Sequence, residues 1–411
     1  MELFPREVYL QKIRGFYHDE EIIKVITGVR RCGKSSLMQT IAQELLAQGV
    51  SPDQIVYLDL DAREHRGVTT ADALEERILE KVKQSERRQY LFIDEIQNVR
   101  DFEPVINGFR TDGGWSIFIT GSNSYLLSGD LVTKLTGRYI EFEMFPLSFE
   151  EYEKMKQFYG IKTETNPLAE LNTYILSGGF PKTLQYRDYS EQRRYVQGIV
   201  QEIFEKDIRH RMKVRDRETF EIVRKYLIAN FGATTNISNI CNALRAQNVA
   251  ITRETISRYV QILVNAKILY ECPRFDIKSK KSLKGEKKYY LSDLGFFYAD
   301  NTDNRINYGP VLENMVYIYA RSHDYQISIG RIGKCECDFI VRGKNLDYAY
   351  IQVAYTILQS KDTEDREYRS LEMIRDNYPK YVLTADYLLQ RRNGITHANL
   401  LDFMKSGASF C

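Results

Sequence analysis

The sequence lacks the features of a secreted, membrane-embedded or zinc-binding protein. Its six cysteines are scattered without a C-x-x-C pair, and Cys335 and Cys337 have no histidine-rich partner nearby, so a zinc site is not expected. No apolar signal-peptide region follows the start. No run of about 18 apolar residues occurs, so we expect no membrane span. These absences favour a reduced, cytoplasmic setting.

An excess of charge of one sign is also missing. The chain has 58 Lys and Arg against 56 Asp and Glu, a net charge of +2, so any nucleic-acid binding must come from a local patch. The composition, 43% hydrophobic and 28% charged, is that of a soluble globular protein. A chain of 411 residues is too long for one core, and we expect about two to four domains.

The first part of the chain alternates strand-like apolar runs with amphipathic helical stretches. Such alternation predicts an α/β fold with a parallel sheet. After Phe149 the pattern becomes helical, and boundaries are expected near residues 148, 216 and 302. The expected strands are Glu21–Thr27, Ile55–Leu60, Tyr90–Asp94 and Trp115–Thr120, and the expected helices are Ser35–Leu46 and Ala71–Gln84.

A glycine-rich turn follows the first expected strand. Gly28-Val-Arg-Arg-Cys-Gly-Lys-Ser35 matches G-x-x-x-x-G-K-[ST], in which backbone N–H groups cradle phosphates at a helix N-terminus. Lys34 would reach the β- and γ-phosphates, and the Ser35 hydroxyl would bind Mg²⁺. The nucleotide-binding residues expected from this P-loop are Gly28, Val29, Arg30, Arg31, Cys32, Gly33, Lys34, Ser35 and Ser36.

The third expected strand ends in two acids. Tyr90-Leu-Phe-Ile-Asp94-Glu95 lies about 60 residues after the P-loop, a context in which such a pair indicates a hydrolytic site. Asp94 would hold Mg²⁺, directly or through water. Glu95 would polarise the attacking water.

Polar residues also follow the fourth expected strand. Ser122, ahead of Asn123, is a candidate for contacting the γ-phosphate or orienting the water; the alternative is an ordinary polar turn. Arg138 is a candidate arginine finger, which would stabilise charge on the equatorial oxygens of the transferred phosphate. Its alternative is a surface arginine in a loop.

Together, GVRRCGKS, LFIDEIQ, ITGSNS, LTGR and SGGFP resemble a family of bacterial and archaeal AAA-type ATPases with a C-terminal domain of unknown function. The resemblance spans essentially the whole chain and is specific in its first 210 residues, where EIFEKDIRHR (202–211) also matches. The resemblance implies ATP as the nucleotide, whereas the motifs alone do not exclude GTP. It also implies that residues 1–148 form the ATPase core and 149–216 a helical lid, which would contain Ser177–Pro181. Sites of this type usually borrow an arginine from a neighbouring subunit, so an oligomer is possible, but the placement of Arg138 within its own chain leaves a monomer possible as well.

Residues 217–301 read as three helices followed by two strands, the order of a winged helix-turn-helix. Its third helix, Thr252–Val264, would expose Arg253, Ser257, Arg258 and Gln261 toward a DNA major groove. The stretch from Arg274 to Lys288 holds seven basic and two acidic residues, a net of +5, and its Lys280 and Lys281 would contact phosphates. Winged helices also serve protein contacts, so double-stranded DNA and a protein partner both remain possible.

Residues 302–411 resemble the PD-(D/E)xK restriction-endonuclease-like fold with a defective site. Glu313 on a helix, Asp338 on a strand and Gln352 on a later strand follow the layout of the metal-binding acids. Gln352 replaces an acid, and Ala354 stands where the catalytic lysine belongs. Lys361 is a possible replacement from the following segment. We expect a fold used for binding rather than cleavage.

The leading hypothesis is an ATPase switch that uses ATP and Mg²⁺ to control contact with DNA or a protein. The rival hypotheses are an ATP-dependent DNA nuclease and a signalling NTPase that binds only proteins. DNA cleavage in the presence of Mg²⁺ or Mn²⁺, and DNA affinity at low salt, distinguish these three functions.

Overall fold

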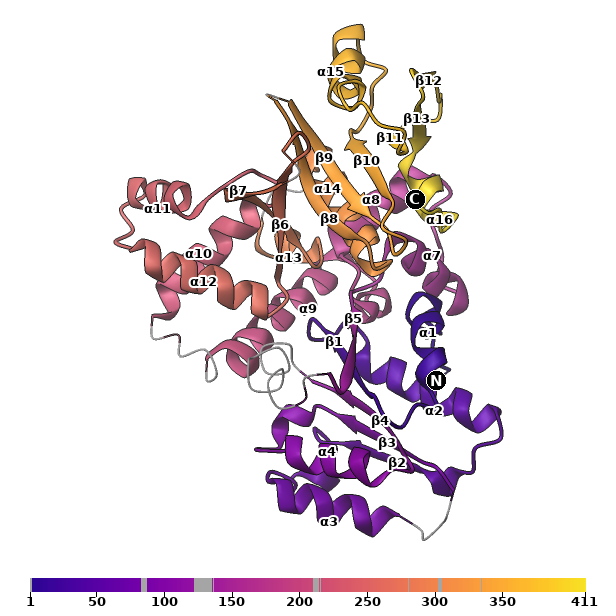
Figure 1. The fold of residues 1–411 in the computed structure, drawn as a ribbon. Helices are drawn as coiled ribbons and strands as arrows, with labels where there is room; N and C mark the ends of the chain where they lie inside the picture. Colours follow the sequence, from indigo (N-terminus) through magenta and orange to yellow (C-terminus); the bar gives the residue numbers. More distant parts are fainter. Residues whose placement is uncertain are drawn as a thin grey trace. The chain divides into compact units, whose positions relative to one another are not determined.

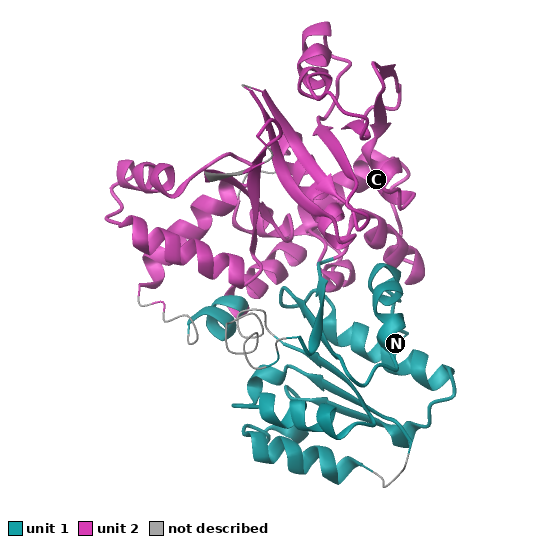
Figure 2. Cartoon of the chain, viewed as in Figure 1, with its two compact units in different colours: residues 1–146, 203–211 teal, residues 147–202, 212–411 magenta. Residues whose placement is uncertain are grey.

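The computed structural model describes residues 2–82, 87–121, 135, 137–209, 214, 216–279, 281–301, 305–333 and 335–411, with the backbone alone at 282–284. The chain divides into two compact units, Met1–Pro146 with Ile203–Arg211, and Leu147–Glu202 with Met212–Cys411 (Figure 2). Within the described ranges, no helix combines the length and apolar character needed to cross a membrane.

The first unit is built on a five-stranded sheet in the order β2-β3-β4-β1-β5, in which every pair of neighbouring strands is parallel (Figure 1). The predicted parallel α/β sheet is therefore confirmed. Strand β5 and helices α1 and α4 were not among the predicted elements. The elements are α1 (Glu7–Ile13), β1 (Ile23–Gly28), α2 (Lys34–Ala47), β2 (Ile55–Asp59), α3 (Ala71–Lys81), β3 (Gln89–Asp94), α4 (Glu103–Asp112), β4 (Trp115–Thr120), β5 (Tyr139–Met144) and the π-helix η6 (Ile203–Arg209).

The inner strands of this sheet are buried on both faces. All six residues of β1 and all six of β3 are buried, whereas the edge strands β2 and β5 are only partly covered. A continuous apolar run is what a parallel strand covered on both faces requires. Because all five strands run in the same direction, the turns after β1, β3 and β4 meet at one edge of the sheet, where ligands bind in open α/β folds.

The second unit contains an eight-stranded mixed sheet in the order β12-β13-β11-β10-β9-β8-β6-β7. Strands β8, β9 and β10 form an antiparallel meander, and β11 returns parallel to β10 after a helix. The strands are β6 (Leu269–Asp276), β7 (Lys281–Leu291), β8 (Gln326–Ile332), β9 (Cys335–Arg342), β10 (Tyr348–Val353), β11 (Lys380–Thr384), β12 (Arg391–Arg392) and β13 (Ile395–Asn399). Strands β12 and β13 follow β11 in the sequence.

The helices of the second unit both precede and interrupt the sheet. Helices α10, α11 and α12 pack together and lead into the β6–β7 hairpin, and Thr235, between α10 and α11, pairs with Lys287 of β7. The helices are α7 (Phe149–Phe158), α8 (Pro167–Ser177), α9 (Tyr189–Glu202), α10 (Arg217–Ala229), α11 (Ile237–Ala246), α12 (Arg253–Asn265), α13 (Gly295–Asp300), α14 (Tyr308–Ser322), α15 (Lys361–Glu372) and α16 (Leu400–Lys405).

Two of the expected domain boundaries differ from this arrangement. Strand β6 pairs in parallel with β8, so a boundary at 302 divides a continuous sheet. Residues Ile203–Arg211, expected in the helical lid, group with the first unit. Local sequence patterns identify the elements but not these long-range pairings.

The SGGFP motif has a packing role in the second unit. The buried Asp293 carboxylate accepts hydrogen bonds from the backbone N–H groups of Gly179 and Gly295, each at 2.7 Å. A Cβ added at Gly178, where φ is +74°, would lie 2.2 Å from Asp293 Oδ1. Burial raises the pKa of the Asp293 carboxyl to about 7. The glycines of the motif thus allow the backbone to approach this carboxylate closely.

Candidate functional site

The P-loop lies at the carboxyl end of β1, as predicted. Strand β1 ends at Gly28, and α2 begins at Lys34 after Gly33, whose φ is 111°. Gly28 has φ 147°, and a Cβ there would lie 2.3 Å from the Met144 carbonyl oxygen, so this position requires glycine. The loop therefore has the strand, turn and helix context that phosphate binding needs.

Lys34 is buried and lies against its own loop. Its Nζ donates a hydrogen bond to the Gly28 carbonyl at 3.1 Å. Arg6 fixes the same loop from outside, because its Nη1 donates to the carbonyls of Cys32 at 2.9 Å and Phe145 at 2.8 Å. Arg6 was not predicted as a site residue, since its partners lie far away in the sequence.

The remaining loop residues differ in exposure. Val29 and Cys32 are buried, and Arg31 and Ser36 are exposed. Arg31 has a left-handed φ of 68°. The inside of the loop is therefore lined by the backbone and Lys34, and not by the exposed side chains.

Asp94 and Ser35, the two predicted Mg²⁺ ligands, are hydrogen-bonded to each other. Asp94 is buried at the end of β3, and the Thr120 hydroxyl also donates to its Oδ1. Burial raises the pKa of the Asp94 carboxyl, and the hydrogen bonds from Ser35 and Thr120 act in the opposite direction. One hydroxyl and one carboxylate fit Mg²⁺, which usually takes few protein ligands beside nucleotide phosphates.

Glu95 follows Asp94 in a left-handed conformation, with φ 60° and ψ 45°. Its backbone N–H donates to Thr120 Oγ1 at 3.1 Å, and the Gln97 side-chain amide donates to its carboxylate. Arg30 of the P-loop lies 3.9 Å from its Oε2. The structure thus brings the predicted acids of β3 to the P-loop, with Thr120 and Gln97 as partners that the sequence reasoning missed.

At the end of β4, the structure describes Thr120 but not the two predicted candidates that follow it. Ser122 and Asn123 lie outside the described residues. Thr120, the last residue of β4, contacts both Asp94 and Glu95. Its position at the carboxyl end of a central parallel strand is the signal that could have identified Thr120 as a site residue.

Arg138, the candidate arginine finger, does not lie beside the P-loop of its own chain. Its carbonyl accepts a hydrogen bond from Ile23 at the start of β1, and its side chain is exposed and donates to Asn107 of α4. Strand β5 pairs Tyr139 with Ile23 and Met144 with Gly28, so Arg138 and the P-loop lie at opposite edges of the sheet. A six-residue strand separates these edges by about 17 Å.

The predicted nucleic-acid residues of the second unit lie mostly on one helix. Arg253, Ser257, Arg258 and Gln261 are all exposed on α12, whose other face packs into the unit. Lys281 is exposed at the start of β7, and Lys280 lies outside the described residues. The predicted outer face of α12 is therefore available for contact with a partner.

The acids of the predicted defective nuclease site surround a lysine. Lys288 of β7 lies 3.0 Å from Glu313 Oε2 and 3.0 Å from Glu336 Oε1. Burial alone would lower the pKa of Lys288, but Glu313, Asp338 and Glu336 raise it above its usual value, so the ammonium stays charged. Burial, reinforced by Glu313, raises the pKa of the buried Asp338 carboxyl well above its ordinary value.

Other side chains occupy the rest of this cluster. The Asp338 Oδ2 accepts from the Val353 N–H at 2.8 Å. Gln352 donates from Nε2 to Glu367 at 3.0 Å and accepts at Oε1 from Ser370 at 3.1 Å. Lys361, the possible replacement for the missing lysine, is 68% exposed and pairs with Glu364 on its own helix.

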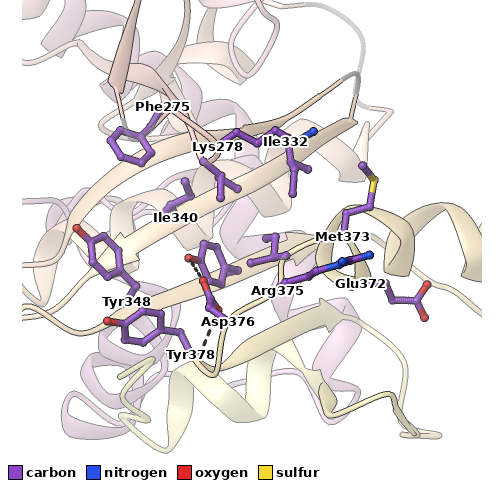
Figure 3. A pocket seen from close by; sticks show the side chains of 13 residues that line it. Phe275, Lys278, Ile332, Ile340, Tyr348, Glu372, Met373, Arg375, Asp376 and Tyr378 are labelled. Atoms are coloured by element: carbon purple, nitrogen blue, oxygen red, sulfur yellow. Dashed lines mark hydrogen bonds between the residues drawn. The ribbon is translucent and has the colours of Figure 1, made fainter.

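A hollow of about 950 Å³ opens elsewhere in the second unit (Figure 3). At one end Tyr348 and Tyr378 meet edge to face, and the Tyr350 hydroxyl donates to Asp376 Oδ2 at 2.6 Å. Arg375 lies farther along the same wall. Among the residues that the structure describes, none of those predicted to bind nucleotide, metal or DNA lines this hollow, so the candidate site remains at the P-loop.

Comparisons with known proteins identify the domains of the chain. A model of an AAA domain matches residues 20–153, and a model described as a domain of unknown function (DUF8612) matches residues 168–304. An uncharacterized protein of Haemophilus influenzae is 35% identical over 404 residues, 98% of each chain. The uncharacterized protein MJ1544 of Methanocaldococcus jannaschii is 29% identical over 360 residues, 85% of this chain and 78% of its own.

One solved structure supports the fold. The Walker-type ATPase PABY2304 of Pyrococcus abyssi superposes with a TM-score of 0.51 at 16% identity, over 72% of this chain and 95% of that one. At this identity the likeness concerns the fold alone. Together with the AAA-domain match, it shows that residues around the P-loop form an AAA-type P-loop ATPase domain.

Proposed function

We propose that this chain, which belongs to the same family as the uncharacterized Haemophilus influenzae protein and carries an AAA domain at residues 20–153, hydrolyses ATP and uses the nucleotide state to control contacts of its second unit. The observation that carries this proposal is the contact between Ser35 and Asp94 beside Lys34. Lys34 would leave the Gly28 carbonyl for the β- and γ-phosphates. Ser35 and Asp94 would hold Mg²⁺, which supplies charge neutralisation on the phosphate oxygens. Glu95 would accept the proton of the attacking water.

Replacing Lys34 with Ala should remove nucleotide binding and therefore hydrolysis. Lys34 is the cation inside the loop, and without it the phosphates lose their main side-chain contact. We expect ATP affinity of the full-length protein to fall by at least about tenfold, measured by titration with a fluorescent ATP analogue. Exchanging the exposed Lys154 for Ala is the control. Unchanged affinity in the Lys34 variant would place the nucleotide elsewhere.

A DNA contact through α12 is the favoured partner interaction, because four polar or basic side chains share its exposed face. Replacing Arg253 and Arg258 together with Ala should weaken binding to duplex DNA, because both side chains would reach into the major groove; the affinity is measured by fluorescence anisotropy from about 50 to 200 mM salt. The matched control replaces Lys154 and Lys344, which are 62% and 71% exposed. If the wild-type protein has no DNA affinity at low salt, a protein partner is favoured instead.

The second unit also supports a nuclease-like fold without nuclease activity. A helix, an antiparallel three-stranded meander, a second helix and a strand parallel to the third follow in the order α14-β8-β9-β10-α15-β11. Lys288 neutralises the acids that would otherwise bind a metal ion. This arrangement favours a binding domain over an ATP-dependent nuclease.

A further inference from the structure

The segment Ile203–Arg211 connects the two units through the chain itself. It belongs to the first unit, whereas the residues immediately before and after it belong to the second. Its described part is the π-helix η6, which follows α9 directly and buries Ile203, Phe204, Asp207 and Ile208. π-Helical turns are rare and often occur at functional sites. A rearrangement of the second unit would therefore act on this segment from both ends.

Asp207 of η6 forms an ion pair with Arg30 of the P-loop. The Arg30 Nε lies 3.0 Å from Asp207 Oδ2, and the Arg30 Nη2 lies 3.1 Å from Oδ1. Asp207 is 5% exposed, and the Arg30 side chain is 10% exposed. A bidentate ion pair that is so little exposed to solvent fixes the guanidinium in position and orientation.

The same guanidinium lies beside the predicted general base. Arg30 Nη2 is 3.9 Å from Glu95 Oε2, longer than its two contacts with Asp207. Arg30 therefore stands between two carboxylates, one in the hydrolytic site and one in the segment connected to the second unit. If the ion pair between Asp207 and Arg30 were weakened, Arg30 could move closer to Glu95 and pair with it.

We propose that Asp207 holds Arg30 off Glu95 and thereby lets the Ile203–Arg211 segment control hydrolysis. Arg30 and Asp207 are positioning residues in this scheme, which rests on the proposed ATPase function. When Asp207 withdraws, the Arg30 guanidinium occupies the Glu95 carboxylate oxygens that must accept the proton from water. Hydrolysis then slows while the P-loop still binds ATP. The second unit would thus set the ATPase rate through the covalent chain.

The test compares Asp207→Asn in two backgrounds of the full-length protein. In the wild-type background it should lower kcat by at least about tenfold and change ATP affinity by less than about threefold. In an Arg30→Gln background the same change should alter kcat by less than about twofold, because the cation it restrains is gone. Glu205→Gln, which removes the same charge from η6 at a residue paired with Arg209, should leave kcat unchanged. Equal losses from Asp207→Asn in both backgrounds would indicate a structural role and overturn the proposal.

Hydrogen exchange separates this inference from the proposed ATPase activity. Binding of a non-hydrolysable ATP analogue should change the exchange of amides 203–209 in the wild-type protein but not in Arg30→Gln. If the wild-type protein binds ATP without hydrolysing it, the ATPase proposal fails, and this exchange difference alone decides whether the segment senses the nucleotide. Exchange that is unaffected by the analogue, or a wild-type rate in Asp207→Asn, overturns the coupling.

Discussion

Replacing Glu95 with Gln is expected to lower kcat for ATP hydrolysis by about 10²- to 10⁴-fold, the usual contribution of a general base. The amide has the shape of the carboxylate but cannot accept a proton from water. Glu95 directly follows Asp94, which is hydrogen-bonded to Ser35 of the P-loop. Neither Asp94 nor Lys34 is altered, so ATP affinity should change by less than about threefold.

The measurement is phosphate release at saturating ATP and Mg²⁺, beside a binding titration with a fluorescent ATP analogue. Glu80→Gln is the matched control, because Glu80 lies on α3 with its side chain 53% exposed. A Glu95→Gln variant that hydrolyses ATP at the wild-type rate would show that another group activates the water. Loss of ATP binding instead would assign Glu95 to the phosphate pocket and leave the base unidentified.

The sequence predicted the nucleotide site well because its determinants are local. The P-loop is one continuous turn, and Asp94 and Glu95 end one buried strand. A short pattern suffices where neighbouring residues create the chemistry. Thr120 was missed because its role comes from the pairing of β4 beside β3, which places its hydroxyl against Asp94.

Arg138 shows the limit of reasoning from motif order. The LTGR motif follows the hydrolytic residues in the sequence, which suggested a place in the same site. Yet Arg138 precedes a parallel strand, so it lies at the amino edge of the sheet, opposite the P-loop. The direction of β5 decides this, and β5 was not predicted, because Glu141 and Glu143 interrupt its apolar pattern at a partly exposed edge.

The ion pairs between distant segments could not be predicted from sequence. Asp207 is 177 residues from Arg30, and no local pattern in either segment indicates that the two side chains pair. Lys288 and Glu313 are 25 residues apart, on β7 and α14. The basic stretch containing Lys288 was interpreted as a wing that could contact DNA phosphates, but β6 joins that hairpin to the large sheet, and Lys288 is buried.

Replacing Lys288 with Met is expected to destabilise the second unit by about 3–5 kcal/mol at pH 7, the usual cost of leaving a buried charge without its partner. Glu313 and Glu336 each lose a 3.0 Å ion pair, and the buried Asp338 loses a nearby positive charge. Lys287→Met is the matched control on the same strand. Lys287 pairs with Glu271 near the surface, so its loss should cost less than about 1 kcal/mol.

The stability lost in Lys288→Met should become smaller as the pH falls, which distinguishes a charge effect from a packing defect. Without Lys288, the pKa of the Asp338 carboxyl in the folded state, which burial already raises, should rise further above that of the unfolded chain. Between the unfolded and folded pKa values, the folded variant then binds more protons, so its stability increases as pH decreases. Urea unfolding of both variants at pH 7 and pH 5 measures this difference.

The same variant also decides between a counter-ion and a catalytic lysine. A nuclease needs its lysine available to the attacking water and its acids available to a metal ion. If Lys288 is committed to the acids, wild-type protein should leave duplex DNA uncut with Mg²⁺ or Mn²⁺, and Lys288→Met should lose stability. If the wild-type protein cuts DNA and Lys288→Met stays stable but stops cutting, Lys288 is the missing catalytic lysine and the domain is a nuclease.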